Sequence, residues 1–381
     1  MSKELEVIMF GPGAVGSEFL RVFNERKPEG IRIAAVSDES AAVMLTGQKV
    51  DDNCVFSQIY EAQQERRLLK DQFEIGRRLV DPSSLKNLVG YDADKRYVVI
   101  DSTNAFTMLD MIYSACENGA GIVSLNKKPY AQGDFEKVNL LMQNALGGKV
   151  QIRGTVGANL GAPDTLIDIL TKEDSHLVYI QGCMSGTLGY ICGGLEQGRK
   201  FSRVVEEAVK KGYTEPCPWD DISGRDVLNK AMILSRLIAS NAMLRYDSIE
   251  VKHESFIGKV MSVDVDTQKI ANLRGDDFVE MTKGLDDGFA ELIHACGDSN
   301  VLRYLAEVSY NEKDSKISIN VSLQAVPKES DIGQLKGTDN IFLFGINGEK
   351  PKMYFPPGPG AGIETTALAI YEPLLKLREI L

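Results

Sequence analysis

The feature that most constrains the fold is a glycine-rich loop near the start of the chain. Its glycines have the spacing Gly-x-Gly-x-x-Gly, directly after the apolar run Val7–Phe10 and before a helix expected over Ser17–Phe23. A dinucleotide-binding turn needs glycine for its tight bend, for backbone approach to a pyrophosphate and for close helix–strand packing. A simple turn is the alternative, but the strand–loop–helix setting favours a bound dinucleotide. The residues expected to contact it are Gly11, Gly13, Ala14, Val15 and Gly16.

The first 150 residues alternate short apolar runs with helical patterns, which is typical of a parallel sheet wound with crossover helices. The sequence therefore predicts an α/β protein whose residues 1–150 form a Rossmann dinucleotide-binding domain. The charged, helix-prone segment Asp51–Lys95 is interpreted as an insertion with no assignable chemistry. The expected strands are Val7–Phe10, Ile31–Val36, Tyr97–Asp101, Ile122–Leu125 and Val150–Arg153.

A second domain of mixed α+β type is expected over residues 151–340. Helices are predicted for Ser202–Lys211, which Gly212 closes, and for about Gly224–Ser240, which carries an apolar stripe. The strict alternation of apolar and polar residues over Ile317–Gln324 predicts a strand with one solvent-exposed face, and Val301–Tyr310 is its expected hairpin partner. Residues 341–381 are expected to return to the first domain.

Asp38 follows the second expected strand, where an acidic side chain accepts hydrogen bonds from the adenosine ribose and repels a 2′-phosphate. No Lys or Arg follows it until Lys49. The sequence therefore favours NAD, with NADP possible. An Asp that merely turns the chain is the alternative reading.

Composition excludes several classes of function. The formal net charge of −11 argues against a nucleic-acid or anionic-membrane surface, and no apolar run approaches the roughly 20 residues of a membrane helix. The start of the chain lacks the pattern of a signal peptide. The six cysteines form no CxxC pair, which suggests reduced thiols and a cytoplasmic protein. No metal site is expected, because the three histidines are not spaced to share one: His176, His253 and His294.

The helix expected from Gly224 carries a pair of opposite charges four residues apart. Asp226 and Lys230 fall on the flank between its exposed and buried stripes, so both are expected to point into a cleft. The acid precedes the base, an order in which the two side chains stabilise each other. Taken alone, such a pair is usually a surface ion pair.

Several segments in order along the chain resemble the homoserine dehydrogenase family. The run Gly212–Pro216, followed by two aspartates, Gly224, Asp226 and Lys230, is similar to the family signature. The further matching segments are Asn126–Pro129, Thr155–Ala158, Ser185–Leu188 and Gly358–Gly362. Together they extend from residue 7 to about residue 370.

This resemblance implies reversible hydride transfer between NAD(P) and the C4 alcohol of L-homoserine, which gives L-aspartate 4-semialdehyde. Lys230 and Lys127 would face the reacting oxygen, one of them exchanging its proton, and Asp226 would orient Lys230 and bind substrate. Glu215 would bind the amino group of homoserine. Asp221 is expected beside it at the substrate.

The resemblance also implies further contacts to the cofactor, from Asn126, Lys127 and Gly360. Thr103 and Asn104 resemble the family's cofactor-contacting loop, although they could equally cap a helix before Phe106.

The sequence departs from the family pattern at Arg153, where many members have a Glu that helps to bind a monovalent cation. A guanidinium cannot ligate a cation, so it is expected to take the place of the ion. The chain stops at Leu381, so no C-terminal regulatory domain is expected.

The family resemblance and the half-exposed sheet of the second domain together predict a homodimer, because a twofold-related copy could cover the exposed face of the sheet. Two alternatives stay open for the function. The first is another Rossmann dehydrogenase of amino-acid metabolism, and the second is a sensor that binds NAD without turnover.

Overall fold

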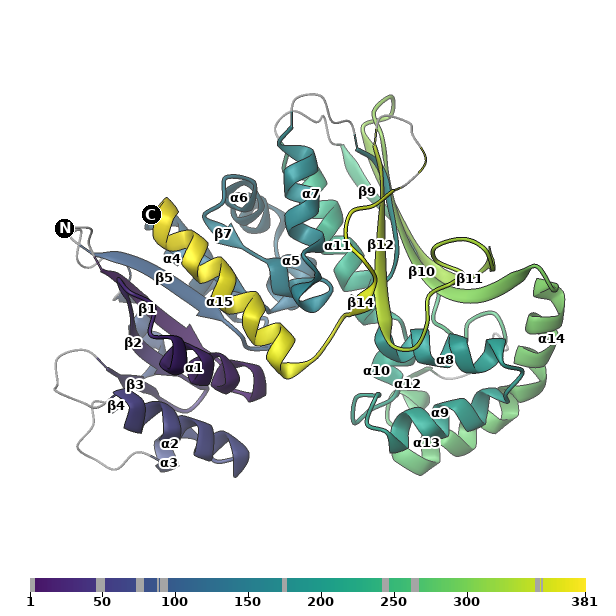
Figure 1. Cartoon of the computed structure of the whole chain (residues 1–381), viewed down its shortest axis with the longest axis horizontal. Coiled ribbons are helices and arrows are strands. Elements are labelled where there is room, and N and C mark those ends of the chain that lie inside the picture. The colour runs from purple at the N-terminus through teal and green to yellow at the C-terminus, as the bar shows by residue number, and fades with distance from the viewer. Residues whose placement is uncertain are drawn as a thin grey trace. The chain divides into compact units, whose positions relative to one another are not determined.

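A computed structural model describes residues 4–45, 52–72, 79–87, 89, 95–172, 177–241, 247–261, 267–346, 350 and 352–381. His176 lies outside these residues, as do parts of the expected insertion. The chain divides into two compact units (Figure 1). Unit 1 comprises Met1–Thr171, Arg236–Asn241 and Ala361–Leu381, and unit 2 comprises Lys172–Ser235 and Ala242–Gly360.

Unit 1 is built on a seven-stranded sheet of order β4-β3-β2-β1-β5-β6-β7. The pairs among β2, β1, β5, β6 and β7 are parallel, whereas β3 and β4 pair antiparallel at the edge. This order confirms the predicted doubly wound sheet. The strands are β1 (Leu5–Phe10), β2 (Ile31–Ser37), β3 (Ala42–Met44), β4 (Leu79–Val80), β5 (Arg96–Asp101), β6 (Gly121–Ser124) and β7 (Val150–Gln151).

Helices cover this sheet because its central strands are mainly apolar, as expected of parallel strands that are buried on both faces. All six residues of β1 are buried. The helices are α1 (Ala14–Arg26), α2 (Asp52–Gln64), α3 (Leu69–Gln72), η1 (Pro82–Asn87), α4 (Met108–Glu117), α5 (Lys127–Gln132), α6 (Phe135–Leu146), η2 (Arg153–Thr155), η3 (Ala158–Leu160), α7 (Ala162–Leu170) and α15 (Ile363–Ile380).

The C-terminal helix α15 completes the core of unit 1. It lies beside α1 in Figure 1, and its residues Ile370, Leu374 and Leu377 are fully buried in the same cluster as Val7 and Phe19. Residues 361–381, which include α15, thus belong to unit 1.

The division into units differs from the predicted boundaries. Residues 151–171 belong to unit 1, not to the second domain, because η2 and η3 pack against α15 and α7 packs against α6. Residues 341–360 belong to unit 2, because β12 (Asp339–Ile346) is hydrogen-bonded to β8 (Leu177–Cys183) in the second sheet.

Unit 2 is built on a mixed sheet of order β13-β12-β8-β10-β11-β9, with β14 paired to β12. The predicted hairpin is confirmed: β10 and β11 pair antiparallel in register from Asn300↔Pro327 to Asn311↔Lys316. The remaining strands are β9 (Ser248–His253), β10 (Asn300–Asn311), β11 (Lys316–Pro327), β13 (Lys352–Met353) and β14 (Gly358–Pro359).

A stack of aromatic rings forms part of the core of unit 2 between its helices. The rings of Phe201 and Phe289 are stacked with centroids 4.1 Å apart, and Phe256 packs against both. The helices of this unit are α8 (Gly186–Glu196), α9 (Phe201–Lys210), α10 (Trp219–Ile222), α11 (Arg225–Ala239), α12 (Thr267–Ile270), α13 (Gly275–Thr282), η4 (Lys283–Leu285) and α14 (Asp286–Cys296). The last four residues of α11 belong to unit 1.

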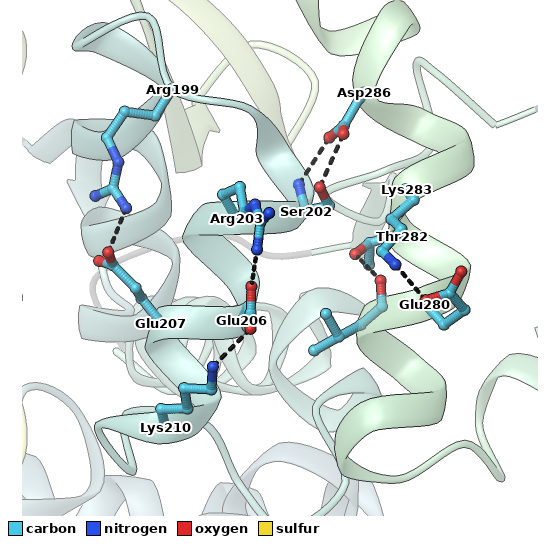
Figure 2. A network of polar contacts seen from close by, with 11 residues as sticks. Arg199, Ser202, Arg203, Glu206, Glu207, Lys210, Glu280, Thr282, Lys283 and Asp286 are labelled. Atoms are coloured by element: carbon cyan, nitrogen blue, oxygen red, sulfur yellow. Dashed lines mark hydrogen bonds and ion pairs between the residues drawn. The ribbon is translucent and has the colours of Figure 1, made fainter.

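The carboxylate of Asp286, the first residue of α14, fixes the start of α9 against α14. Asp286 accepts hydrogen bonds from the backbone N–H and the hydroxyl of Ser202, both at 2.8 Å (Figure 2). The outer face of α9 carries ion pairs such as Lys210–Glu206, which are exposed and contribute little to stability. The buried side of α9, together with its tie to Asp286, therefore determines how it packs.

Gly224, directly before α11, is required by both its backbone and its neighbour. Its φ is +71°, and a Cβ there would overlap the hydroxyl of Tyr304. That hydroxyl donates a 2.6 Å hydrogen bond to the carbonyl of Glu254 and is fixed in place.

We expect Gly224→Ala to lower the free energy of unfolding by on the order of 2–4 kcal/mol, from left-handed strain together with overpacking. Gly198→Ala is the matched control, because φ is +73° there but a Cβ would meet no atom within 4 Å. Urea titrations of both variants measure the difference. Equal losses in the two variants would contradict the overlap with Tyr304.

Candidate active site

The glycine loop lies between β1 and α1, and each glycine has a distinct steric role. A Cβ on Gly11 would lie 2.8 Å from the backbone of Thr103, and one on Gly16 would overlap the carbonyl of Gly11. A Cβ on Gly13 would meet no atom within 4 Å. Gly13 is also the N-cap of α1, where no side chain accepts from the helix and the first turn holds no acid. This open, uncapped helix start fits a pyrophosphate.

A cavity of about 950 Å³ opens beside this loop, entirely within unit 1. We call it the nucleotide cavity. The predicted residues Gly11, Gly13, Asp38, Thr103 and Asn104 all line it. The segment interpreted as an insertion without chemistry contributes much of the remaining wall, through Ile59, Ala62, Gln63, Arg66, Arg67, Leu68, Leu69, Pro82, Ser83 and Lys86.

Asp38 is engaged by the protein itself. Its Oδ1 accepts from the N–H and the hydroxyl of Ser40 at 2.7 and 2.6 Å and from the N–H of Ala41 at 3.0 Å. Its Oδ2 accepts from the N–H of Leu69 at 2.7 Å. These bonds match the turn-forming reading of Asp38, and a ribose would compete with four internal donors.

A buried carboxylate that the sequence reasoning missed joins the ends of β5 and β6. Asp101 is fully buried and accepts from the hydroxyl of Thr103 at 2.7 Å and from the amide of Asn126 at 3.0 Å. Burial raises the pKa of Asp101 to about 6, and the bonds from Thr103 and Asn126 oppose this rise. The available signal was an acid at the end of an apolar run.

The same network defines two predicted cofactor residues. Thr103 does not cap a helix, because α4 begins at Met108 with Thr107 before it, so that alternative is wrong. Asn126 caps α5 by accepting from the N–H of Lys128 at 3.2 Å. Lys127, the first residue of α5, is half-buried and belongs to unit 1.

Lys230 is buried in unit 2, with 7% of its surface exposed. Its ammonium donates to the carbonyl of Met184 at 2.5 Å and forms an ion pair with Asp226 at 2.9 Å. The side chain of Asp226 is 40% exposed. This pair therefore differs from an ordinary surface ion pair, because the ammonium of Lys230 is buried whereas the carboxylate of Asp226 is partly exposed to solvent.

The segment Gly212–Pro216 is tied to α10 through Asp221. The Oδ2 of Asp221 accepts from the N–H of Glu215 at 2.8 Å, and its Oδ1 accepts from the hydroxyl of Thr187 at 3.0 Å. Burial raises the pKa of Asp221 to about 6. Asp221 thus holds the backbone of Glu215, whose own side chain is exposed.

Gly360 lies at the end of unit 2, just after β14. A Cβ at this position would overlap the side chain of Asn340. The amide of Asn340 is fully buried, and neither of its polar atoms has a hydrogen-bond partner. Gly360 is therefore fixed by packing within its own unit.

Arg153, the departure from the family pattern, pairs with carboxylates of unit 1. Its Nε donates to Asp164 and its Nη1 to Glu372, both at 2.6 Å. The guanidinium thereby links α7 to α15 and supplies a fixed positive charge at this position.

Among the residues that the structure describes, no helix is both long and apolar enough to cross a bilayer. Within the same residues, no three His, Cys, Asp or Glu side chains are grouped so that they could hold a metal ion.

The sheet order, the uncapped glycine turn and the cavity beside it define an α/β protein of the nucleotide-binding dehydrogenase class. A family model for homoserine dehydrogenase matches residues 166–375. The chain belongs to the homoserine dehydrogenase family.

Known relatives agree with this assignment. The chain is 31% identical over 308 residues to bifunctional aspartokinase/homoserine dehydrogenase 1, chloroplastic, of Zea mays, covering 79% of this chain and 32% of that protein. It is 26% identical to the homoserine dehydrogenase of Saccharomyces cerevisiae, covering 99% of both. A hyperthermophilic archaeal homoserine dehydrogenase in complex with NADPH shares the fold, with a TM-score of 0.69, 18% identity and coverage of 99% and 98%. The chain spans about a third of the length of the bifunctional maize relative.

The raised pKa of Asp101 predicts a pH-dependent stability. Between pH about 4 and 6, the carboxyl of Asp101 keeps its proton in the native state but has lost it in the unfolded chain. The contribution of Asp101 to the free energy of unfolding is therefore complete below pH about 4. It is lost as the pH rises through 6, by on the order of 2–3 kcal/mol. We therefore expect the stability of the native protein relative to Asp101→Asn to fall between pH 4 and pH 7 in urea titrations.

Asp110→Asn is the control for this experiment. Lys137 lowers the pKa of the exposed Asp110, so the effect of that carboxylate has the opposite sign. A stability difference for Asp101→Asn that does not change with pH would show that its carboxyl titrates normally.

Proposed function

We propose that this protein is a homoserine dehydrogenase that interconverts L-homoserine and L-aspartate 4-semialdehyde with NAD(P). The observation that carries the proposal is the buried ammonium of Lys230, held by Asp226 and the carbonyl of Met184. A buried lysine that is paired with a partly exposed carboxylate is well placed to exchange protons with a small substrate.

A bound nicotinamide would supply the acceptor for the hydride that leaves C4 of homoserine and, in its reduced form, the donor of hydride to the aldehyde. Lys230 in its neutral form takes the hydroxyl proton during oxidation, so the C–H and O–H bonds break while the C=O bond forms. In reduction the same ammonium returns the proton to the carbonyl oxygen. Asp226 keeps Lys230 oriented, and Lys127 is proposed as a second donor to the reacting oxygen.

The amino-acid substrate brings a charged ammonium that requires an acidic partner. Glu215 is proposed for this role, because its exposed side chain extends from a backbone that Asp221 holds at 2.8 Å. Asp221 contributes by fixing that loop, since both of its oxygens already accept hydrogen bonds.

The cofactor is proposed to bind along the loop Gly11–Gly16, with Thr103 and Asn104 at the cavity wall. The amide of Asn126 supports this wall, because it also donates to Thr103 at 3.1 Å. Gly360 is proposed to contact the cofactor through its backbone. The archaeal relative with NADPH supports this class of ligand.

Replacing Lys230 with Met removes the proton acceptor while keeping an unbranched side chain of similar length. We expect kcat for homoserine oxidation to fall by about 10²- to 10⁴-fold, the usual contribution of general acid–base catalysis. NADH or NADPH formation, followed by absorbance, measures the rate.

Lys210→Met, an exposed lysine on α9, is the control and should keep full activity. Undiminished turnover by Lys230→Met would remove Lys230 from its role. A native protein that binds dinucleotide yet never oxidises homoserine would favour another dehydrogenase or a non-catalytic sensor.

A homodimer is proposed on the polar face of the sheet in unit 2. Glu307 accepts there from Gln181 at 3.0 Å, from Asn320 at 3.0 Å and from Gln324 at 2.9 Å. Ser309 and Ser318 beside this cluster are exposed and lie opposite each other in the hairpin. A twofold mate placed on this face would cover it with its own copy of the same polar groups.

Ser318→Arg should dissociate such a dimer, because it would bring a large charged side chain from each protomer into the proposed interface. Sedimentation velocity measures the change in mass. Gln197→Arg, exposed at the C-terminal end of α8, adds the same charge away from this face and should leave the dimer intact. A native protein that sediments as a monomer would contradict the proposal.

A cytoplasmic location is also proposed. It is supported by the thiols of Cys116, Cys183, Cys192, Cys217 and Cys296, all of which are free.

A further inference from the structure

Asn340 is a buried polar residue of unit 2 to which the proposed mechanism gives no role. It lies in β12 and is fully buried. Among the residues that the structure describes, it is the only one with two buried polar side-chain atoms that lack a hydrogen-bond partner, Nδ2 and Oδ1. A buried amide without partners raises the free energy of the folded protein, so its retention requires an explanation.

Other buried asparagines show what an amide at this depth normally does. The Nδ2 of Asn126 donates to Asp101 at 3.0 Å, and the Nδ2 of Asn241 donates to the carbonyl of Leu170 at 2.9 Å. Each of these amides holds two segments of the chain together. The amide of Asn340 makes no such bond, so stabilisation of this conformation does not account for it.

Two segments with a part in the proposed chemistry flank Asn340. Its backbone pairs with Gly358 of β14, two residues before Gly360. The start of β12 also pairs with the end of β8, one residue before Met184. The carbonyl of Met184 accepts the 2.5 Å hydrogen bond of the Lys230 ammonium. Asn340 therefore lies between the strand that supports Lys230 and the segment that leads to Gly360.

Gly360 packs directly on the amide of Asn340. A Cβ on Gly360 would overlap the Nδ2 and the Cγ of Asn340. Gly360 does not have the left-handed φ that favours glycine, so its backbone alone would accept another residue. The glycine is thus required by its close approach to Asn340, which brings peptide groups beside an amide that lacks partners.

We propose that Asn340 is a positioning residue for hydride transfer, whose amide hydrogen-bonds the main chain at Gly360 in the reactive conformation. This proposal rests on the proposed function, in which the backbone of Gly360 contacts the cofactor. A side-chain amide offers two donors and one acceptor oxygen, which match the C=O and N–H groups of a peptide. Because the amide has no partner in the present conformation, these bonds favour the conformation that makes them.

The amide acts through Gly360 and not on the reacting atoms. A carboxamide neither takes nor gives up a proton near neutral pH, so it cannot replace Lys230 as the acid or base. Fixing residues 358–360 against the strand that carries Met184 instead maintains the alignment on which the rate depends.

Replacing Asn340 with Leu tests the proposal, because leucine has a similar branched shape and no polar atom. We expect the urea midpoint to equal or exceed that of the native protein, since a buried amide without partners is removed. We expect kcat for homoserine oxidation to fall by about 10- to 100-fold. The KM for homoserine should change by less than about threefold. Asn340→Ala, which cannot overpack against Gly360, should show the same loss of kcat.

Asn241→Leu is the matched control, because it removes a buried amide that already has a partner. The carbonyl of Leu170 would lose its 2.9 Å donor, so the urea midpoint should fall. The kcat of this variant should equal that of the native protein.

Hydrogen exchange gives a readout that needs no turnover. NADPH and homoserine together cannot react, because the cofactor is already reduced and the substrate is the alcohol. In the native protein we expect this pair of ligands to slow amide exchange over residues 352–362 by about tenfold. In Asn340→Leu the same ligands should slow exchange there by less than about twofold.

A lower urea midpoint with an unchanged kcat in Asn340→Leu would make the role of Asn340 purely structural and overturn the proposal. A raised KM with the native kcat would show direct substrate binding and would also overturn it. Ligands that protect other segments of the native protein, but residues 352–362 equally in both proteins, would contradict the proposal alone. Ligands that slow exchange nowhere in the native protein would instead contradict the proposed function.

Discussion

The close approach of the β1–α1 turn to the end of β5 is the constraint on which the nucleotide site depends. The hydroxyl of Ser102 donates to the carbonyl of Gly11 at 2.7 Å, and the missing Cβ of Gly11 lets the two backbones touch. Asp101 then accepts a hydrogen bond from Thr103, and Asn126, which follows the next strand β6, donates to Asp101. Three strand ends are thereby locked into one surface, and the open helix start at Gly13 acquires a fixed wall. Such preorganisation reduces the entropic cost of binding a ligand, because the wall of the site is already ordered.

In unit 2 a glycine likewise permits a close approach of two segments, and here it positions Lys230. Gly224 lets α11 begin against Tyr304, and this start determines where Lys230, almost two turns later, enters the interior. The carbonyl of Met184 and the carboxylate of Asp226 then receive its ammonium. A buried charge is tolerated only when it is paired and hydrogen-bonded, so these two acceptors account for the presence of a lysine at this depth.

Local patterns predicted much of this structure because they depend on neighbours in the sequence. The glycine turn, the β10–β11 hairpin and the helix carrying Asp226 and Lys230 all follow from short-range spacing. The sequence did not predict the partners of Asp38, since its bond to Leu69 spans 31 residues. It missed Asp101 for a related reason: the burial of an acid at the end of a strand depends on neighbours far along the chain, here Asn126, which lies between β6 and α5. The boundary near residue 150 shifted because η2 and η3 pack on α15, which follows about 200 residues later.

Asp38 illustrates why a single acidic position in the sequence is a weak guide to the role of its side chain. The rule for Asp38 assumes that its carboxylate has no other partner and that the cations near a 2′-phosphate are close to it in sequence. In this fold the first assumption fails through the turn at Ser40, and the second fails because the segment after β3 returns to the same cavity. A net charge of −11 does not oppose a local cationic wall, because charges in water are screened beyond a distance of about 10 Å. Most of the charged residues that line the nucleotide cavity come from the segment to which the sequence assigned no chemistry.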